Sequence, residues 1–494
     1  MSGRSGNGAR PVIGEPEHVL PPLGPGSLTP FFATAPNPEA TRRLLLVFFY
    51  FAPSAEVGAL RWLSLARFGA QRRWAIDVVT LRPEFMGIID RDRLAQLPPG
   101  VRLFGFSGEN PGWYRAMLAA WRRFGSGGGT RAADSGLAGH LDGNDLTGAF
   151  ATPDAPAWRR AFRSYVHFSL ADLFTRRASA LGSALARENR YAVVVSSGPP
   201  HAAHDTARQI ADGARLPFVM DMRDPWSDDS ATPEELRSEA WRRAARAREA
   251  RCVTAARLVV VTSPAHEELQ IAKYPSLRGR VTTVMNGADP EPLPSSRARE
   301  RFVIAFAGMI YLGRDPRALF RAAARVAREA GASPAEFAVE FMGDDACEGV
   351  PLTSIAADEG LGAYFRSHAF RPRNEALEFL AEASLLVSLP LRTSMTLPAK
   401  LFEYSRFDAW VLVLAEPGSA TEKLLAGTDA NIVAPDDTDA IAKVIATRFA
   451  EFRAGARPVA LNSDGRFDRA TQSARLFDAL DVLAQEGIAA PVER

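Results

Sequence analysis

The chain has 494 residues, of which 47% are hydrophobic and 23% charged, and its 59 basic and 57 acidic side chains leave a net charge of +2. This length exceeds a single compact core and favours two domains of ordinary globular composition. Because the charges nearly cancel, no overall positive field favours nucleic acid as a partner. Cys252 and Cys347 lie outside any metal-ligand spacing, which fits a protein of the reducing cytoplasm without structural disulfides.

The first residues differ in composition from the rest of the chain. Residues 1 to about 40 are rich in proline, glycine and polar residues, which predicts a disordered tail. They contain no apolar segment of the kind that a secretory signal needs. The most apolar stretch, residues 44–52, is about half as long as a membrane span, so we interpret it as a buried strand.

Strand and helix patterns alternate from residue 41 to residue 290 and predict a first Rossmann-like domain. Apolar runs at residues 44–51 and 75–81 flank a helical pattern at residues 59–70, and this spacing is typical of a parallel sheet. Further strands are expected at residues 191–197, 216–224, 256–263 and 281–287. A glycine-rich polar segment, residues 125–157, predicts a flexible insertion.

A second domain is expected over residues 291–460, after a proline- and serine-rich connector. Its strands are expected at residues 302–308, 337–345, 385–390 and 410–416. The last segment, residues 461–494, contains a helical pattern that we expect to pack back toward the first domain. Two doubly wound α/β domains, each with strand-to-helix turns at one edge of its sheet, predict a ligand site in the cleft between them.

Common catalytic motifs are missing from the sequence. It contains no GxxxxGK[ST] phosphate loop, no GxSxG elbow, no HExxH helix and no GxGxxG turn after the first strand. The main arguments for a P-loop ATPase, a serine hydrolase and a dehydrogenase are therefore absent.

Polar residues nevertheless follow three of the expected strands. The turn that ends at Gly58 precedes a helix whose N-terminal amides suit an anion, and a plain tight turn explains it equally well. His201 begins another helix, where a neutral imidazole is favoured at pH 7 in either a functional or a structural role. Arg223 and Asp224 end an apolar strand, where charges suit either a binding site or a structural ion pair.

Several segments, taken in order, resemble family 4 glycosyltransferases, which are retaining, nucleotide-sugar-dependent enzymes of the GT-B fold. NGAD at residues 286–289 is similar to the hinge of that family, and the strand and loop at residues 301–319 to its phosphate-contacting loop. FMGDD at residues 341–345 resembles its GdG turn, and residues 397–425 resemble its donor segment with a K-x-x-E pattern. The first half contributes YFAPSAEVGALRWLSLA and VVVSSGPPHAAH, so that the resemblance spans about residues 43–455.

The resemblance implies a role for each matching residue. Arg314 and Lys400 would neutralise the donor diphosphate, and with His201, near the transferred sugar, they form the expected catalytic group. Glu403 would accept hydrogen bonds from the ribose, although Lys400 and Glu403 would also fit an ordinary exposed helix pair. The other expected donor contacts are Gly58, Gly308, Leu401, Gly418 and Ser419, and the expected acceptor-side residues are Arg223 and Asp224. No metal and no cofactor other than the nucleotide sugar is expected.

The implied activity is transfer of a sugar to a hydroxyl of a glycan, a lipid-linked acceptor or a small molecule, in bacterial cell-surface glycan or glycolipid synthesis. A non-hydrolysing nucleotide-sugar epimerase is an alternative with the same fold. A non-catalytic GT-B scaffold or regulatory protein is another, because Met309 and Met395 depart from the family pattern.

Aromatic residues and arginines alternate near residues 113–124 and 158–165. This pattern suits contact with an anionic bilayer, which would place the protein at the inner face of the cytoplasmic membrane. Amphipathic helices packed on the first domain are the competing explanation.

Overall fold

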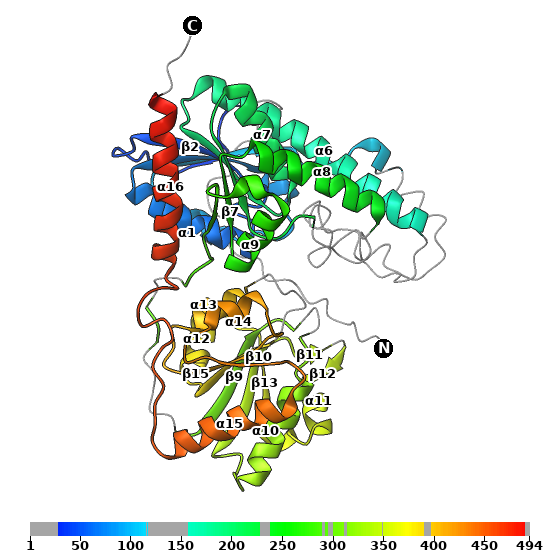
Figure 1. Ribbon diagram of the computed structural model, residues 1–494, viewed down its shortest axis with the longest axis vertical. Coiled ribbons are helices and arrows are strands. Elements are labelled where there is room, and N and C mark those ends of the chain that lie inside the picture. Colours follow the sequence, from blue (N-terminus) through cyan, green and yellow to red (C-terminus); the bar gives the residue numbers. More distant parts are fainter. Residues whose placement is uncertain are drawn as a thin grey trace, which may run out of the picture.

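The computed structural model describes residues 28–114, 116, 157–227, 238–288, 292–294, 300–310, 314–347, 349–389 and 397–489. These residues form two α/β domains, each built on a largely parallel sheet, and the first domain lies above the second in Figure 1. Residues 1–27 of the expected tail and residues 125–156 of the expected insertion lie outside the described residues.

The first sheet has eight strands in the order β1-β4-β3-β2-β5-β6-β7-β8. They are β1 (Phe32–Ala33), β2 (Arg42–Val47), β3 (Trp74–Leu81), β4 (Val101–Phe106), β5 (Val193–Gly198), β6 (Phe218–Met222), β7 (Leu258–Val261) and β8 (Val281–Thr283). All neighbours are parallel except β1 and β4. Strands β3, β5 and β6 are buried along their whole length, because helices cover both faces of the sheet.

The end of the expected disordered tail is ordered, so that prediction is wrong for these residues. Phe32 and Ala33 pair with Leu103 and Arg102 of β4. Phe31 and Phe32 also pack against the core of the first domain. Two aromatic side chains within a polar segment provide enough apolar surface to hold this edge strand against the sheet.

The helices of the first domain are α1 (Val57–Gln71), α2 (Asp92–Ala95), α6 (Ala157–Glu188), α7 (Ala202–Ala214), α8 (Glu239–Ala255) and α9 (Pro264–Lys273), with short 3₁₀ turns at Pro83–Phe85 and Pro275–Leu277. Serine side chains cap the N-termini of two of these helices. Ser238 accepts a hydrogen bond from the Trp241 amide at the start of α8, and Ser263 accepts one from the His266 amide at the start of α9.

The second sheet has six parallel strands in the order β13-β10-β9-β14-β15-β16. They are β9 (Phe302–Gly308), β10 (Phe337–Gly343), β13 (Phe365–Ala369), β14 (Leu385–Ser388), β15 (Trp410–Leu414) and β16 (Asn431–Val433). A small hairpin joins β11 (Ala346–Cys347) to β12 (Val350–Pro351). The helices are α10 (Arg317–Glu329), α11 (Leu352–Asp358), α12 (Arg373–Ala381), α13 (Ala399–Tyr404), α14 (Ala420–Leu425) and α15 (Thr438–Arg453), with a 3₁₀ turn at Gly362–Tyr364.

The last helix, α16 (Arg469–Ala489), packs against α1 and β5 of the first domain (Figure 1). Its Asp481 accepts hydrogen bonds from Arg42, from Arg72 at 2.6 Å and from the indole of Trp74 at 2.9 Å. The chain therefore leaves the first domain, completes the second, and returns to the first.

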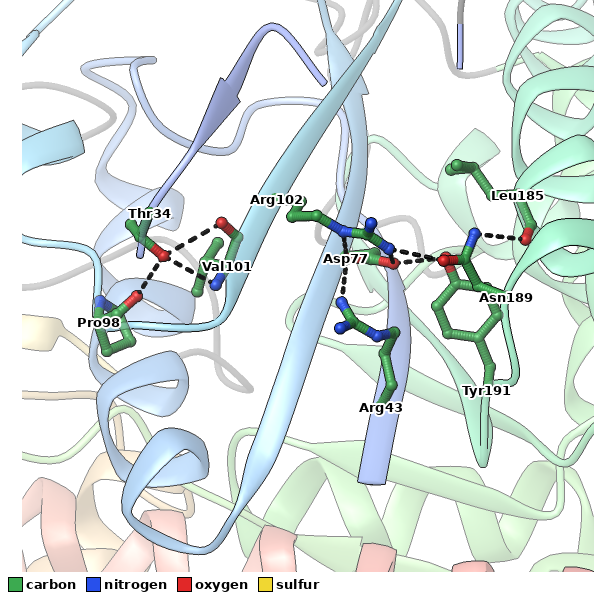
Figure 2. A network of polar contacts seen from close by, with 9 residues as sticks. All are labelled: Thr34, Arg43, Asp77, Pro98, Val101, Arg102, Leu185, Asn189 and Tyr191. Atoms are coloured by element: carbon green, nitrogen blue, oxygen red, sulfur yellow. Dashed lines mark hydrogen bonds and ion pairs between the residues drawn. The ribbon is translucent and has the colours of Figure 1, made fainter. Parts of the chain in front are cut away.

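A buried carboxylate joins neighbouring strands of the first sheet. Figure 2 shows Asp77 of β3 between Arg43 of β2 and Arg102 of β4. Asp77 Oδ1 lies 2.7 Å from Arg43 Nη1, and Oδ2 accepts from Arg102 Nη2 and from the Tyr191 hydroxyl, each at 2.6 Å. Burial, followed by the Asp77 charge, raises the pKa of Tyr191. Arg43 and Arg102 are each the second residue of their strands, so this network lies away from the carboxyl ends that carry the candidate site.

Candidate active site

The expected site residues gather where the chain order of each sheet reverses. In the first sheet this point lies between β2 and β5, and in the second between β9 and β14. Gly58 and His201 follow β2 and β5, whereas Gly308 ends β9 and Lys400 lies in α13, after β14. Ligands of doubly wound sheets bind at the carboxyl ends of the strands at this reversal. The structure therefore places residues from both halves of the chain where this fold class binds ligands.

His201 is a partly buried, neutral imidazole at the start of α7. Its ring stacks on the indole of Trp226 with centroids 5.0 Å apart and an angle of 12° between the planes. Burial, and then the neighbouring His204 and Arg223, hold the pKa of His201 well below its usual value. Nδ1 of His201 is buried and has no hydrogen-bond partner among the described residues. The ring can therefore offer a hydrogen bond to a ligand without carrying a positive charge.

Arg223 lies directly over Gly58, and this contact assigns a steric role to the glycine. A Cβ atom on Gly58 would lie 1.8 Å from Arg223 Nη1. The guanidinium is 4.9 Å from the Phe48 ring centroid and donates to the Pro199 carbonyl. Beside it, burial raises the pKa of Asp224, against the opposing effect of Arg223. Arg223 and Asp224, the two expected acceptor-side residues, thus lie together beside Gly58.

Arg61, which no motif of the sequence indicated, connects α1 and β6 to the expected hinge. Arg61 of α1 is buried and pairs with Asp221 of β6 at 2.9 Å. It also donates to the Met285 carbonyl at 3.1 Å and to Asn286 Oδ1 at 3.3 Å, in the expected hinge. An arginine within the apolar helical pattern of residues 59–70 was the signal that could have indicated this role, because such a charge needs a buried partner.

In the second domain, Lys400 lies against Gly308 at the carboxyl end of β9. Lys400 Nζ donates to the Ala307 carbonyl and sits 4.2 Å from the centroid of the Phe306 ring. Gly308 has φ +132°, and a Cβ atom there would lie 1.6 Å from Lys400 Nζ. Burial, and next the charge of Arg314, lowers the pKa of Lys400 to about 7. Gly308 is therefore required both for its backbone conformation and for the position of the ammonium group.

Arg314 and Glu403 flank this lysine. Arg314 is buried, and its Nη1 donates to the Met309 carbonyl at 2.7 Å. Glu403 pairs with Arg373 of α12 at 3.0 Å. The adjacent Tyr404 hydroxyl accepts a hydrogen bond from the Ala307 amide at 3.1 Å, which ties α13 to the end of β9. This arrangement brings two cations and one carboxylate to the same edge of the sheet.

The remaining expected donor contacts have structural roles. The side chain of Leu401 is buried in the hydrophobic core, so that only its backbone remains for a ligand. Gly418 has φ +77°, and its amide donates to the Glu422 carboxylate. The Ser419 hydroxyl accepts from the Glu422 amide at 3.3 Å and begins α14. Met395 lies outside the described residues.

No protein-family model and no curated protein sequence matches the chain. Solved structures do match. Sucrose-phosphate synthase from Thermosynechococcus elongatus is 13% identical over 89% of this chain and 99% of its own, with a TM-score of 0.55. HepE from Anabaena, in complex with UDP and glucose, is 15% identical over 89% of this chain and 100% of its own, with a TM-score of 0.51. α,α-Trehalose 6-phosphate synthase from Burkholderia multivorans is 13% identical over 92% of this chain and 99% of its own, with a TM-score of 0.52.

The chain has the GT-B fold. Because the sequence identities are 15% or lower, the similarity to these solved structures applies to the arrangement of the two domains and their sheets. In this GT-B chain the domains meet at α9 and α14, where Glu268 and Lys423 form an ion pair at 3.0 Å. The contacts of His201 and Lys400 described above each lie within their own domain.

Among the described residues, no group of three or more His, Cys, Asp or Glu side chains could hold a metal ion. Asp344 stabilises the turn after β10, because its Oδ2 accepts a hydrogen bond from the Ile310 amide at 2.7 Å. None of the helices in the described part of the chain combines the length and apolar composition needed to cross a membrane.

The aromatic and arginine-rich segments are only partly described. Trp113, Phe162 and Tyr165 are exposed, whereas Tyr114 is fully buried. Residues 117–124 lie outside the described part of the chain, and the side chains of residues 158–160 are not described.

Proposed function

We propose that this chain is a retaining glycosyltransferase resembling family 4, which transfers a hexosyl or other glycosyl group from a nucleoside-diphosphate sugar to an acceptor hydroxyl. We place this reaction in bacterial cell-surface glycan or glycolipid synthesis. The main support is the position of Lys400 and Arg314 beside Gly308, at the chain reversal of the second sheet. Two neighbouring cations at this point suit a diphosphate. UDP is the first nucleotide to test, because HepE, which has a similar fold, was solved with UDP and glucose.

In the proposed reaction the bond between the anomeric carbon and the diphosphate oxygen breaks, and the diphosphate takes the electron pair. The acceptor oxygen forms the new bond on the same face, and its proton passes to the departing phosphate. Lys400 and Arg314 stabilise the negative charge that develops on the leaving group. The neutral His201 hydrogen-bonds the transferred sugar through Nδ1, for which the described part of the chain provides no partner.

We infer that no metal is needed, because the two cations supply the charge that a metal would otherwise provide. The test is turnover of a nucleotide sugar after treatment with a chelator, and unchanged turnover is expected. Activity that is lost with EDTA and restored by Mg²⁺ or Mn²⁺ would contradict this inference.

We also propose that the exposed Trp113, Phe162 and Tyr165 contact an anionic membrane surface, which would suit a lipid-linked acceptor. The test is co-sedimentation with vesicles that contain an anionic lipid. Replacing Trp113 and Tyr165 by serine is expected to reduce the bound fraction. Equal binding by the double variant would contradict the proposal.

Nucleotide binding is tested by thermal shift with UDP, UDP-glucose and other nucleoside diphosphates, since a ligand of the native state raises the apparent stability. Lys400→Ala should abolish the shift. Lys443→Ala, on the exposed face of α15, is the matched control and should retain it. An undiminished shift in Lys400→Ala would show that the site is elsewhere. No shift with any nucleotide would favour the scaffold alternative, and epimerised nucleotide sugar without acceptor would favour the epimerase.

A further inference from the structure

The indole of Trp226 is a buried ring beside the candidate active site of the first domain. The residue follows the end of β6, and its side chain is 5% exposed. The indole stacks on the His201 imidazole, with centroids 5.0 Å apart and an angle of 12° between the planes. It also lines a cavity of about 360 Å³. Trp226 is therefore in direct contact with a residue of the expected catalytic group.

Hydrogen bonds hold the chain on both sides of Trp226. Before it, the Arg223 carbonyl accepts a hydrogen bond from the Thr262 hydroxyl at 2.7 Å. After it, the Ser227 hydroxyl donates to the fully buried carboxylate of Glu249. A large ring between two anchored residues in a close-packed interior has few alternative positions. The indole is therefore a fixed surface against which another ring can be placed.

The orientation of the His201 ring depends on neighbouring rings. Nδ1 of His201 is buried and has no hydrogen-bond partner in the described part of the chain. Besides the indole, the ring of His204 contacts it, with centroids 5.6 Å apart. His204 is itself fixed, since its Nδ1 lies 2.7 Å from Ser196 Oγ. Imidazole nitrogens form hydrogen bonds in the plane of the ring, so a face-on contact with the indole leaves those directions open.

The surroundings of His201 favour its neutral form. Burial has the largest effect on its pKa, which lies well below the usual value. Charged and titratable side chains from four elements lower this pKa further: His204 of α7, Arg223 after β6, His167 of α6 and His266 of α9. Trp226 carries no charge and contributes by excluding water from one face of the imidazole. Loss of the indole would therefore hydrate His201 without changing the charges around it.

We propose that Trp226 is a positioning residue of the transfer reaction. Its indole holds the His201 ring in the orientation in which Nδ1 reaches the transferred sugar, and it keeps water from the face of that ring. This role rests on the proposed function, whereas the contact itself can be tested without a substrate. Because Lys400 and Arg314 lie in the other domain, loss of the indole should slow the transfer and leave nucleotide binding intact.

The first experiment is NMR on the full chain, with ¹³C in the rings of its seven histidines, between pH 5 and pH 8. His201→Gln identifies the His201 resonances. In the wild-type chain at least one ring proton of His201 should be shifted upfield by the indole, and the ring should not titrate. In Trp226→Met, which keeps an apolar side chain but removes the ring, the pKa of His201 should rise into this range. Trp226→Phe keeps an aromatic face and should resemble the wild-type chain.

Turnover of a nucleotide sugar is the second measurement. In Trp226→Met kcat should fall by about ten- to a hundredfold, as expected for a misplaced reacting group, with little change in the donor KM or in the thermal shift with UDP. Trp226→Phe should recover most of the rate. Trp410→Met is the matched control, because this tryptophan is similarly buried, at 8% exposed, but belongs to β15 of the second domain. It should leave the titration of His201 unchanged.

Three NMR results would overturn the positioning role: no upfield shift of His201 protons in the wild-type chain, no change of the His201 titration in Trp226→Met, or equal changes in Trp226→Met and Trp226→Phe. The first result needs no variant, so it applies even where Trp226→Met does not fold. Transfer with an unchanged kcat in Trp226→Met would remove the role and keep the proposed function. The expected NMR behaviour without transfer or a UDP shift would support the stacking contact and remove the transferase assignment.

Discussion

Buried neutral histidines make the first domain sensitive to acid. Burial lowers the pKa of His204 to about 3, and burial with the charge of Arg248 lowers that of His167 to about 4. The unfolded chain binds these protons near pH 6.5. The stability contributed by the neutral rings is therefore complete above pH 6.5 and falls as the pH drops toward the folded values, by about 1.4 kcal/mol per pH unit for each histidine.

The measurement is urea unfolding at pH 7.5, 6 and 5, followed by tryptophan fluorescence. Between pH 6 and pH 5 these two histidines should lower the unfolding free energy by roughly 2–3 kcal/mol, and His201, whose pKa burial also holds well below its usual value, adds to the fall. His167→Gln should reduce this slope. Equal slopes in the wild-type chain and in His167→Gln would contradict the expectation.

Lys400 should make donor binding depend on pH in the opposite direction. Because burial lowers its pKa to about 7, this lysine is charged in more acidic solution and becomes neutral as the pH rises above 7. A bound diphosphate favours the charged form, so the Kd for UDP-glucose should increase by up to about tenfold per pH unit above 7. Calorimetric titration at pH 6.5, 7.5 and 8.5 measures this change. In Lys400→Arg the side chain stays charged, so the Kd for UDP-glucose should not depend on pH over this range. A Kd that still rises with pH in this variant would exclude Lys400 as the titrating group.

The close approach of Gly308 to Lys400 gives a steric test of the same site. In Gly308→Ala the new methyl group would lie 1.6 Å from Nζ, so Lys400 must move and nucleotide binding should be lost. Gly331→Ala is the matched control, because Gly331 also has a positive φ, of +59°, but has no neighbouring atom within 4 Å of the added Cβ. It should cost about 1 kcal/mol of stability and leave the nucleotide thermal shift unchanged. Similar nucleotide binding by both variants would remove the steric argument.

At the scale of elements, Arg61 joins α1, β6 and the hinge. Arg61→Ala would leave the Asp221 carboxylate buried with only Trp62 and Ser197 as hydrogen-bond donors. The loss of one partner of a buried pair should cost about 3–5 kcal/mol in urea unfolding. Arg67→Ala, on an exposed part of the same helix, should cost less than about 1 kcal/mol. Comparable losses in the two variants would mean that the Arg61 contacts contribute little.

The strands also show how much of the fold the sequence could predict. Long apolar runs identified the central strands, and the expected strand at residues 302–308 coincides with β9. Edge strands gave weaker signals, because β13 carries Arg366, Ser367 and His368 and lies against only one neighbour. The sequence placed Gly58 and Arg223 in the site separately, but their contact across more than a hundred residues depends on the paired strands. No local pattern encodes a contact of that kind.

At the scale of the whole molecule, α16 makes the stability of the first domain depend on residues that follow the second. Phe477 is fully buried, and its ring lies so close to Gly69 of α1 that a Cβ atom there would be 2.5 Å from the ring. The same ring contacts Phe68 and Trp74, with centroids 5.9 and 6.3 Å away. Loss of α16 would therefore expose apolar surface on α1 and β3, whereas the core of the second domain would stay covered.

Phe477→Ala should lower the unfolding free energy of the first domain by about 3–5 kcal/mol, because it removes a buried ring and leaves a cavity. Val482→Ala on the exposed side of the same helix should change it by less than about 0.5 kcal/mol. Limited proteolysis with mass spectrometry locates the effect, since new cleavage sites should lie in the first domain and the second should stay resistant. Cleavage in both domains at the same rate would instead show that the two unfold as one unit, with α16 transmitting the loss to the whole chain.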